Sequence, residues 1–173
     1  MNIELKNKFL YFQKYKLRCS IGKRGISIKK REGDKKTPKG EFRLKYILYC
    51  KDRIFKLKTK LKKIPINKKM GWCDDPNSDH YNKIINYPFK FSAEKLWKKE
   101  NIYDIIIVID YNLNPVIKNK GSAIFLHIAK KKYQPTKKFF CNMNKKDNIE
   151  INIEDEEPEF DADLVDSLPP TDY

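Results

Sequence analysis

Residues 121–127 read GSAIFLH, an apolar run that begins with glycine and ends with histidine. This pattern predicts a short buried strand over residues 123–129. Residues 104–110, with the sequence DIIIVID, predict a second buried strand because they are short and β-branched. Two earlier stretches, the apolar run 9–12 and the alternating run 15–21, also predict strands. Since strands prevail, we expect the fold class to be mainly β.

The remaining segments predict one more strand, a connection and a helix. Residues 41–50 alternate, with Phe42, Leu44, Tyr46 and Leu48 expected on one face. Residues 51–69 are rich in lysine and are expected to form a basic connection. Ser92 is a plausible N-cap for a helix over residues 93–99.

His127 is one of only two histidines in the chain. Side chains alternate between the two faces of a strand, so Leu126 is expected on the core face and Phe125 and His127 on the other. His127 would then lie near the end of its strand, off the core face, where it could contact a ligand. The alternative is a histidine that is satisfied by a backbone partner. His80, the second histidine, stands in a polar loop and is expected at the surface.

The four cysteines are Cys19, Cys50, Cys73 and Cys141. No pair has the CxxC spacing of a zinc ribbon or thioredoxin-like motif, and the irregular spacing does not predict a disulfide framework. Cys141 follows His127 by one loop and is a candidate nucleophile, because a nearby imidazole favours the thiolate. The alternative is a cysteine that packs as a small hydrophobe. No Gly-rich phosphate loop or zinc-ligand cluster is present, so the sequence predicts no metal and no cofactor.

Charge divides the chain unevenly. Residues 1–146 hold all 38 Lys and Arg but only 12 of the 23 Asp and Glu, and the remainder of the chain holds 11 acids and no base. We expect one domain over residues 1–150, followed by an acidic, disordered tail over residues 151–173. The basic body is compatible with nucleic acid or another anionic polymer. Its lysines are scattered rather than gathered in one arm, which argues against a dedicated nucleic-acid function.

Five motifs occur in order along the chain: GDxxTPxGxF at 33–42, GWCDDP at 71–76 with Tyr81-Asn82 after it, Tyr103-Asp104, GSAIFLH at 121–127, and YxPT at 133–136. As an ordered set they resemble the L,D-transpeptidase catalytic domain, also called the YkuD domain. The resemblance covers most of residues 1–147.

The resemblance implies a β-sandwich-like fold with one or two short helices and a cysteine acyltransferase site. In that family a cysteine thiolate attacks a carbonyl of a peptidoglycan stem peptide, D-alanine leaves, and the resulting thioester passes to an amine of another stem. It implies Cys141 as the nucleophile and His127 as the general base. It also implies substrate-binding roles for Ser122, Tyr133 and Thr136.

The family also implies a location in the periplasm or cell wall. No signal peptide is predicted from the first residues, because a glutamate stands among them and no apolar h-region follows. No apolar run approaches the length of a membrane-spanning helix. The oligomeric state is not predicted.

The sequence departs from the family at the cysteine. The family has Thr or Ser, one further residue, and then Gly-Cys, so that Phe139 stands where its cysteine is expected. Cys141 comes two residues later and has no glycine before it. Two alternatives to an active enzyme follow: a catalytically degenerate member that only binds wall peptides, and a basic nucleic-acid-binding β domain.

Overall fold

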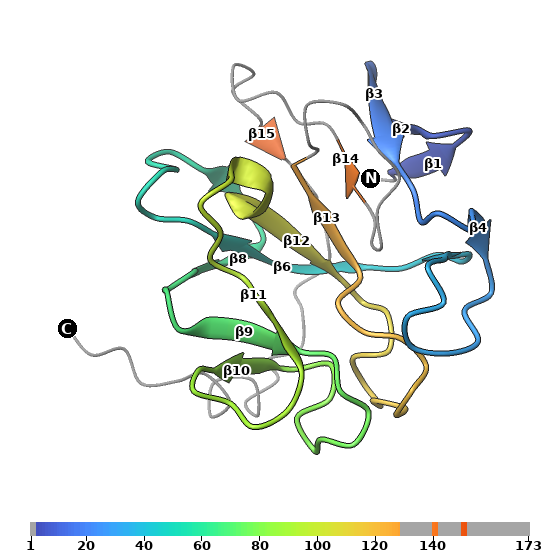
Figure 1. Ribbon diagram of the computed structural model, residues 1–173. Coiled ribbons are helices and arrows are strands. Elements are labelled where there is room, and N and C mark those ends of the chain that lie inside the picture. Colours follow the sequence, from blue (N-terminus) through green and yellow to red (C-terminus); the bar gives the residue numbers. More distant parts are fainter. Residues whose placement is uncertain (1–2, 129–139, 142–149, 152–173) are drawn as a thin grey trace.

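The protein is described by a computed structural model over residues 3–128, 140–141 and 150–151 (Figure 1). These residues form a mainly β fold, and the only helix among them is one short 3-10 turn. The elements are β1 (Glu4–Lys6), β2 (Phe9–Phe12), β3 (Tyr15–Ser20), β4 (Ile26–Ser27), β5 (Thr37–Pro38), β6 (Leu44–Tyr49), β7 (Lys58–Thr59), β8 (Lys62–Pro65), β9 (Met70–Cys73), β10 (Ile84–Asn86), β11 (Ala93–Lys95), η1 (Asn101–Tyr103), β12 (Ile105–Ile109), β13 (Phe125–His127), β14 (Phe140–Cys141) and β15 (Glu150–Ile151).

The central sheet has the strand order β13-β12-β6-β8. β12 pairs antiparallel with both β13 and β6, and β8 runs parallel to β6. β12 confirms the strand predicted from DIIIVID, and β2 and β3 confirm the two strands predicted near the N-terminus. β13 begins later than expected, because the chain reaches strand geometry only at Phe125, after Ala123 adopts a φ of 51°. Residue 129, the predicted end of this strand, lies outside the described residues.

Both faces of the central sheet are buried. The first core, which includes Leu48, Ile106 and Phe125, lies between this sheet and the β10-β9-β11 sheet. The second core, which includes Ile107 and Leu126, lies between the central sheet and the β1-β2-β3 strands. The β12 sequence is apolar throughout because its side chains enter both cores alternately.

The prediction that the Phe125 face of β13 lies off the core is therefore wrong. Phe125 is fully buried, and its ring packs edge-on against Trp72 of β9, with 4.9 Å between the ring centroids. The β10-β9-β11 sheet covers this face, which a single strand's alternation could not reveal. A strand with one large apolar residue on each face has no solvent face.

Three other predictions need correction. Residues 51–69 are not only a connection, since β7 and β8 lie within them and β8 extends the central sheet. Leu44 does not share a face with Tyr46 and Leu48: the β6–β12 register shifts between Val108 and Ile109, and Leu44 packs against the second core. Such an irregularity turns one residue to the other face.

The helix predicted over residues 93–99 is absent. Its first residues form β11, which pairs antiparallel with β9. The side chain of Ser92 does not cap a helix, because its hydroxyl lies 2.7 Å from Oδ1 of Asp74. Pairing with β9 places Ala93 opposite Cys73, so tertiary contacts override the local capping signal.

The remaining strands add edges to this arrangement. β14 pairs antiparallel with β3, and β15 pairs parallel with β7. β4 and β5 form a short parallel pair near the motif at residues 33–42. The structure contains no helix, among the residues it describes, that is long and apolar enough to cross a membrane.

Candidate active site

His127 is the last residue of β13 and is fully buried. Its Nδ1 lies 3.0 Å from the carbonyl oxygen of Ile102 and 3.2 Å from that of Ile128. A carbonyl oxygen only accepts, so these contacts assign the proton of the neutral imidazole to Nδ1. The Nε2 atom of this tautomer carries the lone pair, which is the arrangement that a general base requires.

The ring of Tyr103 packs against the imidazole ring of His127 and helps to fix its orientation. The two rings pack edge-on with centroids 4.7 Å apart. Tyr103 is almost fully buried, and burial raises the pKa of its hydroxyl well above the ordinary value, so the ring stays neutral at physiological pH. Two of the contacts to His127 therefore come from η1: the Ile102 carbonyl and the Tyr103 ring.

A buried ion pair holds η1 in place. Asp104 follows η1 and is fully buried, and its Oδ1 lies 2.5 Å from Nε of Arg53. The Arg53 guanidinium also donates to the carbonyl of Lys98 and to Sγ of Cys50, both at 3.0 Å. This network ties the connection after β6 to both sides of the turn that carries Ile102. The motif Tyr103-Asp104 thus has a structural explanation: one residue contacts His127 and the other anchors the turn.

Burial excludes Cys50 as an easily activated thiol. Desolvation raises the pKa of its thiol, although Arg53 opposes that effect. Cys50 is 1% exposed and belongs to the first core. We assign it a packing role.

The segment before β13 is held by Tyr81 and Asn82. The Tyr81 hydroxyl donates to Oε2 of Glu32 at 2.5 Å and accepts from the backbone N–H of Gly121 at 2.9 Å. The side-chain oxygen of Asn82 accepts from Trp72 Nε1 at 2.9 Å and from the Ala123 N–H at 3.0 Å. Asn82 therefore links the GWCDDP motif to the GSAIFLH run by hydrogen bonds to both.

Position 121 requires glycine because of its backbone conformation and its close neighbour Lys29. Its φ is 109°, and a Cβ atom there would lie 2.3 Å from Cε of Lys29. Lys29 and Asp34 form a second buried ion pair, with 2.5 Å between Nζ and Oδ1. The Asp34 carboxylate also accepts from the backbone N–H groups of Lys30 and Lys36. The GDxxTPxGxF motif is thus organised around one carboxylate, and the ion-pair partner of that carboxylate, Lys29, packs beside Gly121.

The pKa of Asp34 reflects two opposing effects. Burial alone would raise the pKa of this carboxyl, but the Lys29 ammonium and the two backbone N–H groups favour the charged form. The balance holds the pKa below the ordinary value. At neutral pH the carboxylate is charged and accepts these hydrogen bonds.

Two of the predicted substrate-binding residues, Tyr133 and Thr136, lie outside the described residues. The third, Ser122, is 2% exposed and lies between Gly121 and Ala123. The structure places His80 at the surface, as expected, where its ring contacts Phe89. Asp75 accepts from the backbone N–H of Asn77, which lowers the pKa of its carboxyl and is typical of a turn.

Cys141 lies in β14, directly opposite Cys19 of β3, and Phe140 lies opposite Ser20. β14 is also in contact with β13, the strand that ends at His127. The backbone of the candidate nucleophile thus runs between the N-terminal hairpin and the strand of the candidate base (Figure 1).

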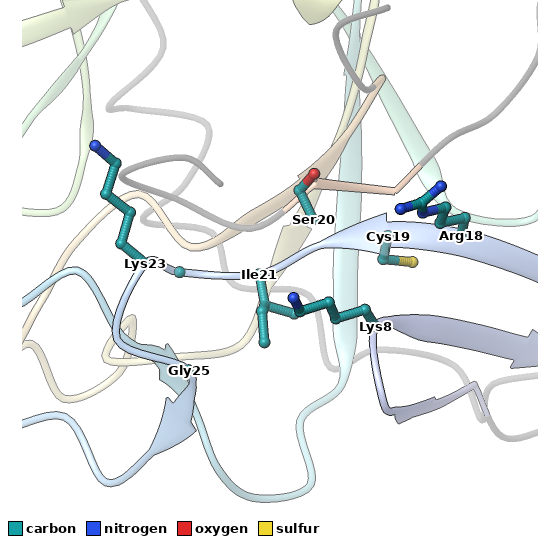
Figure 2. A pocket seen from close by; sticks show the side chains of 8 residues that line it. Lys8, Arg18, Cys19, Ser20, Ile21, Lys23 and Gly25 are labelled. Atoms are coloured by element: carbon teal, nitrogen blue, oxygen red, sulfur yellow. The ribbon is translucent and has the colours of Figure 1, made fainter. Parts of the chain in front are cut away.

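A cavity of about 260 Å³ lies beside β3. Its lining includes Cys19 and Ser20 of β3 and the cationic residues Lys8, Arg18 and Lys23 (Figure 2). Ser20 is 4% exposed, and its hydroxyl has no hydrogen-bond partner within the described part of the chain. The described residues hold no group of three or more His, Cys, Asp or Glu side chains that could bind a metal ion.

Sequence reasoning missed Arg53 and undervalued Asp104 and Asn82. Arg53 stands in a lysine-rich connection, where nothing local distinguishes it from its neighbours. Asp104 and Asn82 were visible as motif residues, yet their partners lie 51 and 41 positions away. Only the fold shows what they bind.

The described residues form stacked β-sheets that hold a buried histidine, bonded to a backbone carbonyl, at the end of a central strand, next to a strand that carries a cysteine. The family model YkuD, the L,D-transpeptidase catalytic domain, matches residues 3–146. The chain belongs to this family. No curated protein and no solved structure matches it.

Proposed function

We propose that this protein is a cysteine acyltransferase that acts on peptidoglycan stem peptides, with His127 as the general base and Cys141 as the nucleophile. The observation that carries the proposal is the geometry of His127. Its Nδ1–H donates to the Ile102 carbonyl, so Nε2 is the atom that accepts a proton. Membership of the L,D-transpeptidase family supplies the substrate class.

The reaction proceeds in two acyl transfers. His127 Nε2 takes the thiol proton of Cys141, and the thiolate attacks a carbonyl carbon of the stem peptide. Backbone N–H groups stabilise the oxyanion, the imidazolium returns the proton to the departing D-alanine amine, and a thioester remains. An amine of a second stem then attacks the thioester, gives its proton to His127 and releases the thiolate. If water attacks the thioester in place of that amine, the overall reaction is that of a carboxypeptidase.

An assay with a stem tetrapeptide and an acceptor amine tests the proposal. The parent chain, Cys141→Ala and His127→Ala are compared, with His80→Ala as the matched histidine control. Loss of the base is expected to lower kcat/KM by a factor of about 10²–10⁴, and loss of the nucleophile to abolish thioester formation. His80→Ala retains the parent rate. Equal activity in all four proteins would rule out this mechanism.

A second candidate, a catalytically degenerate member that binds wall peptides, is favoured by one observation. Cys19, the register partner of Cys141, packs in the second core, whereas His127 shares a face of β13 with Phe125 of the first core. The sequence adds that Cys141 has no preceding glycine. Binding of the tetrapeptide by parent and Cys141→Ala alike, with no turnover by either, would support this candidate over the first.

A further inference from the structure

Two cysteines that are 122 positions apart in the sequence are paired residues in one antiparallel ladder. The register places Cys19 of β3 directly opposite Cys141 of β14. Directly opposed residues of antiparallel strands have Cα atoms about 4.5 or about 5.5 Å apart. A disulfide bridges Cα separations of about 4.4–6.8 Å, so the backbone of this pair needs no rearrangement to be cross-linked.

The Sγ atom of Cys19 donates to the carbonyl of Leu17 at 3.4 Å. The residue is only 2% exposed, but it lines the cavity beside β3. Figure 2 shows its sulfur projecting from β3 near the side chains of Lys8 and Arg18. A small reagent in this cavity therefore lies next to Cys19, and the lysine and arginine side chains of the lining attract an anionic oxidant.

The other two cysteines lack this arrangement. Cys73 lies in β9 and is opposite Ala93 of β11. Cys50 follows β6 and packs in the first core, where its thiol interacts with Arg53. Among the described residues, Cys19 and Cys141 are the only cysteines that strand pairing brings together.

We propose that Cys19 and Cys141 are a redox-modification site that forms a cross-strand disulfide, with a low-molecular-weight anionic disulfide such as oxidised glutathione as the oxidant. One protein thiolate attacks a sulfur of the oxidant, breaks its S–S bond and releases one glutathione thiolate. The second protein thiolate then attacks the protein sulfur of the mixed disulfide and releases the other glutathione. Two protein thiols are oxidised, one oxidant molecule is reduced to two thiols, and the two protons pass to the released glutathione.

The consequence for activity rests on the proposed function. If Cys141 is the nucleophile, the disulfide removes its thiolate and stops acyl transfer until a reductant restores it. The cross-link itself requires no activity, because it depends on the register alone.

The full-length chain, reduced and then treated with oxidised glutathione, tests the proposal by peptide mapping under non-reducing conditions. We expect a linked pair of peptides that contain Cys19 and Cys141, and an intact mass lower by two hydrogen atoms. Cys19→Ala abolishes the linked pair, whereas the matched control Cys73→Ala retains it. A parent chain that carries only glutathione at Cys141, or that links other cysteines equally fast, would overturn the proposal.

A second measurement keeps the outcome independent of how well a variant folds. The folded parent is oxidised, assayed with the tetrapeptide and acceptor amine, and then reduced and assayed again. Recovery of activity with reductant supports the switch. If the linked pair forms but the protein is inactive both oxidised and reduced, the disulfide proposal is supported. Only the proposed acyl transfer is then contradicted.

Discussion

Single residues explain why the motifs have the residue types that they have. Asn82 has a φ of 59° and uses its side chain to bind Trp72, Ala123 and two carbonyls of the connection after β12. Asparagine tolerates this backbone conformation and offers both a donor and an acceptor. Gly121 is required because Lys29 occupies the space of a side chain. Neither residue touches a reacting atom, yet both determine where the His127 strand begins.

The Asp34 carboxylate gives a pH prediction at this scale. Because its folded-state pKa lies below the ordinary value of 3.8, its stabilisation is fully present above that value and is lost as the pH falls through the folded pKa. We expect Asp34→Asn to lower the free energy of unfolding by about 1–3 kcal/mol at pH 7. Urea unfolding at pH 7 and pH 3 measures the effect. The gap between parent and variant should narrow at pH 3, and a gap that widens on acidification would contradict the assignment.

At the scale of secondary-structure elements, the orientation of His127 depends most on η1, a single 3-10 turn. It supplies the carbonyl that binds His127 Nδ1 and the ring of Tyr103, and the Arg53–Asp104 pair holds it. A short 3-10 turn has little stability by itself, so tertiary contacts must determine its position. The structure therefore separates the residue that is proposed to act, His127, from the residues that orient it.

Asp104→Asn tests this dependence. Removing one charge of a buried pair leaves the other without its partner, and since Arg53 retains some exposure we expect a loss of about 1–3 kcal/mol in the free energy of unfolding. The NMR signals of His127 should also lose their preference for the Nδ1–H tautomer, while those of the exposed His80 serve as an internal reference.

The matched control is Asp79→Asn, which breaks the exposed ion pair with Lys118. It should leave the free energy of unfolding unchanged within error. If Asp104→Asn unfolds like the parent and keeps the His127 tautomer, then η1 is held by other contacts.

At the scale of the whole molecule, two buried cores and a divided charge dominate. The described sheets stack so that the central one has no exposed face, which explains a core of aliphatic side chains in a chain of net charge +15. Most of the described lysines are exposed, with Lys29 as a buried exception. The segment after residue 146 carries acids without bases. We propose that residues 1–150 are the folded domain and that residues 151–173 are an acidic tail.

Truncation after Ile151 tests this division and keeps the β15–β7 pair intact. We expect the free energy of unfolding to match that of the parent, because the cores lie within the retained residues. The truncated chain loses nine acids and should elute from a polyanion column at higher salt. A large loss of stability on truncation would place the deleted residues within the fold.

Local sequence was a good guide wherever the signal lies within one element. The β-branched run of β12 and the apolar run of β2 could be predicted as strands from their own residues, since a short uncharged run is expected in a buried strand. β8 and β11 could not be found in this way, because their strand geometry comes from pairing with β6 and β9. Strand pairing is a long-range interaction, and propensity is weak against it.

The sequence by itself determined the mainly β class and the family, and it proposed His127 as the candidate base, because ordered motifs and a scarcity of histidines leave few alternatives. Only the tertiary structure decided that His127 is buried on both sides, that its Nδ1 binds the Ile102 carbonyl, and that Cys141 lies opposite Cys19. These relations join residues that are 25 and 122 positions apart, and chain folding alone brings such distant groups together.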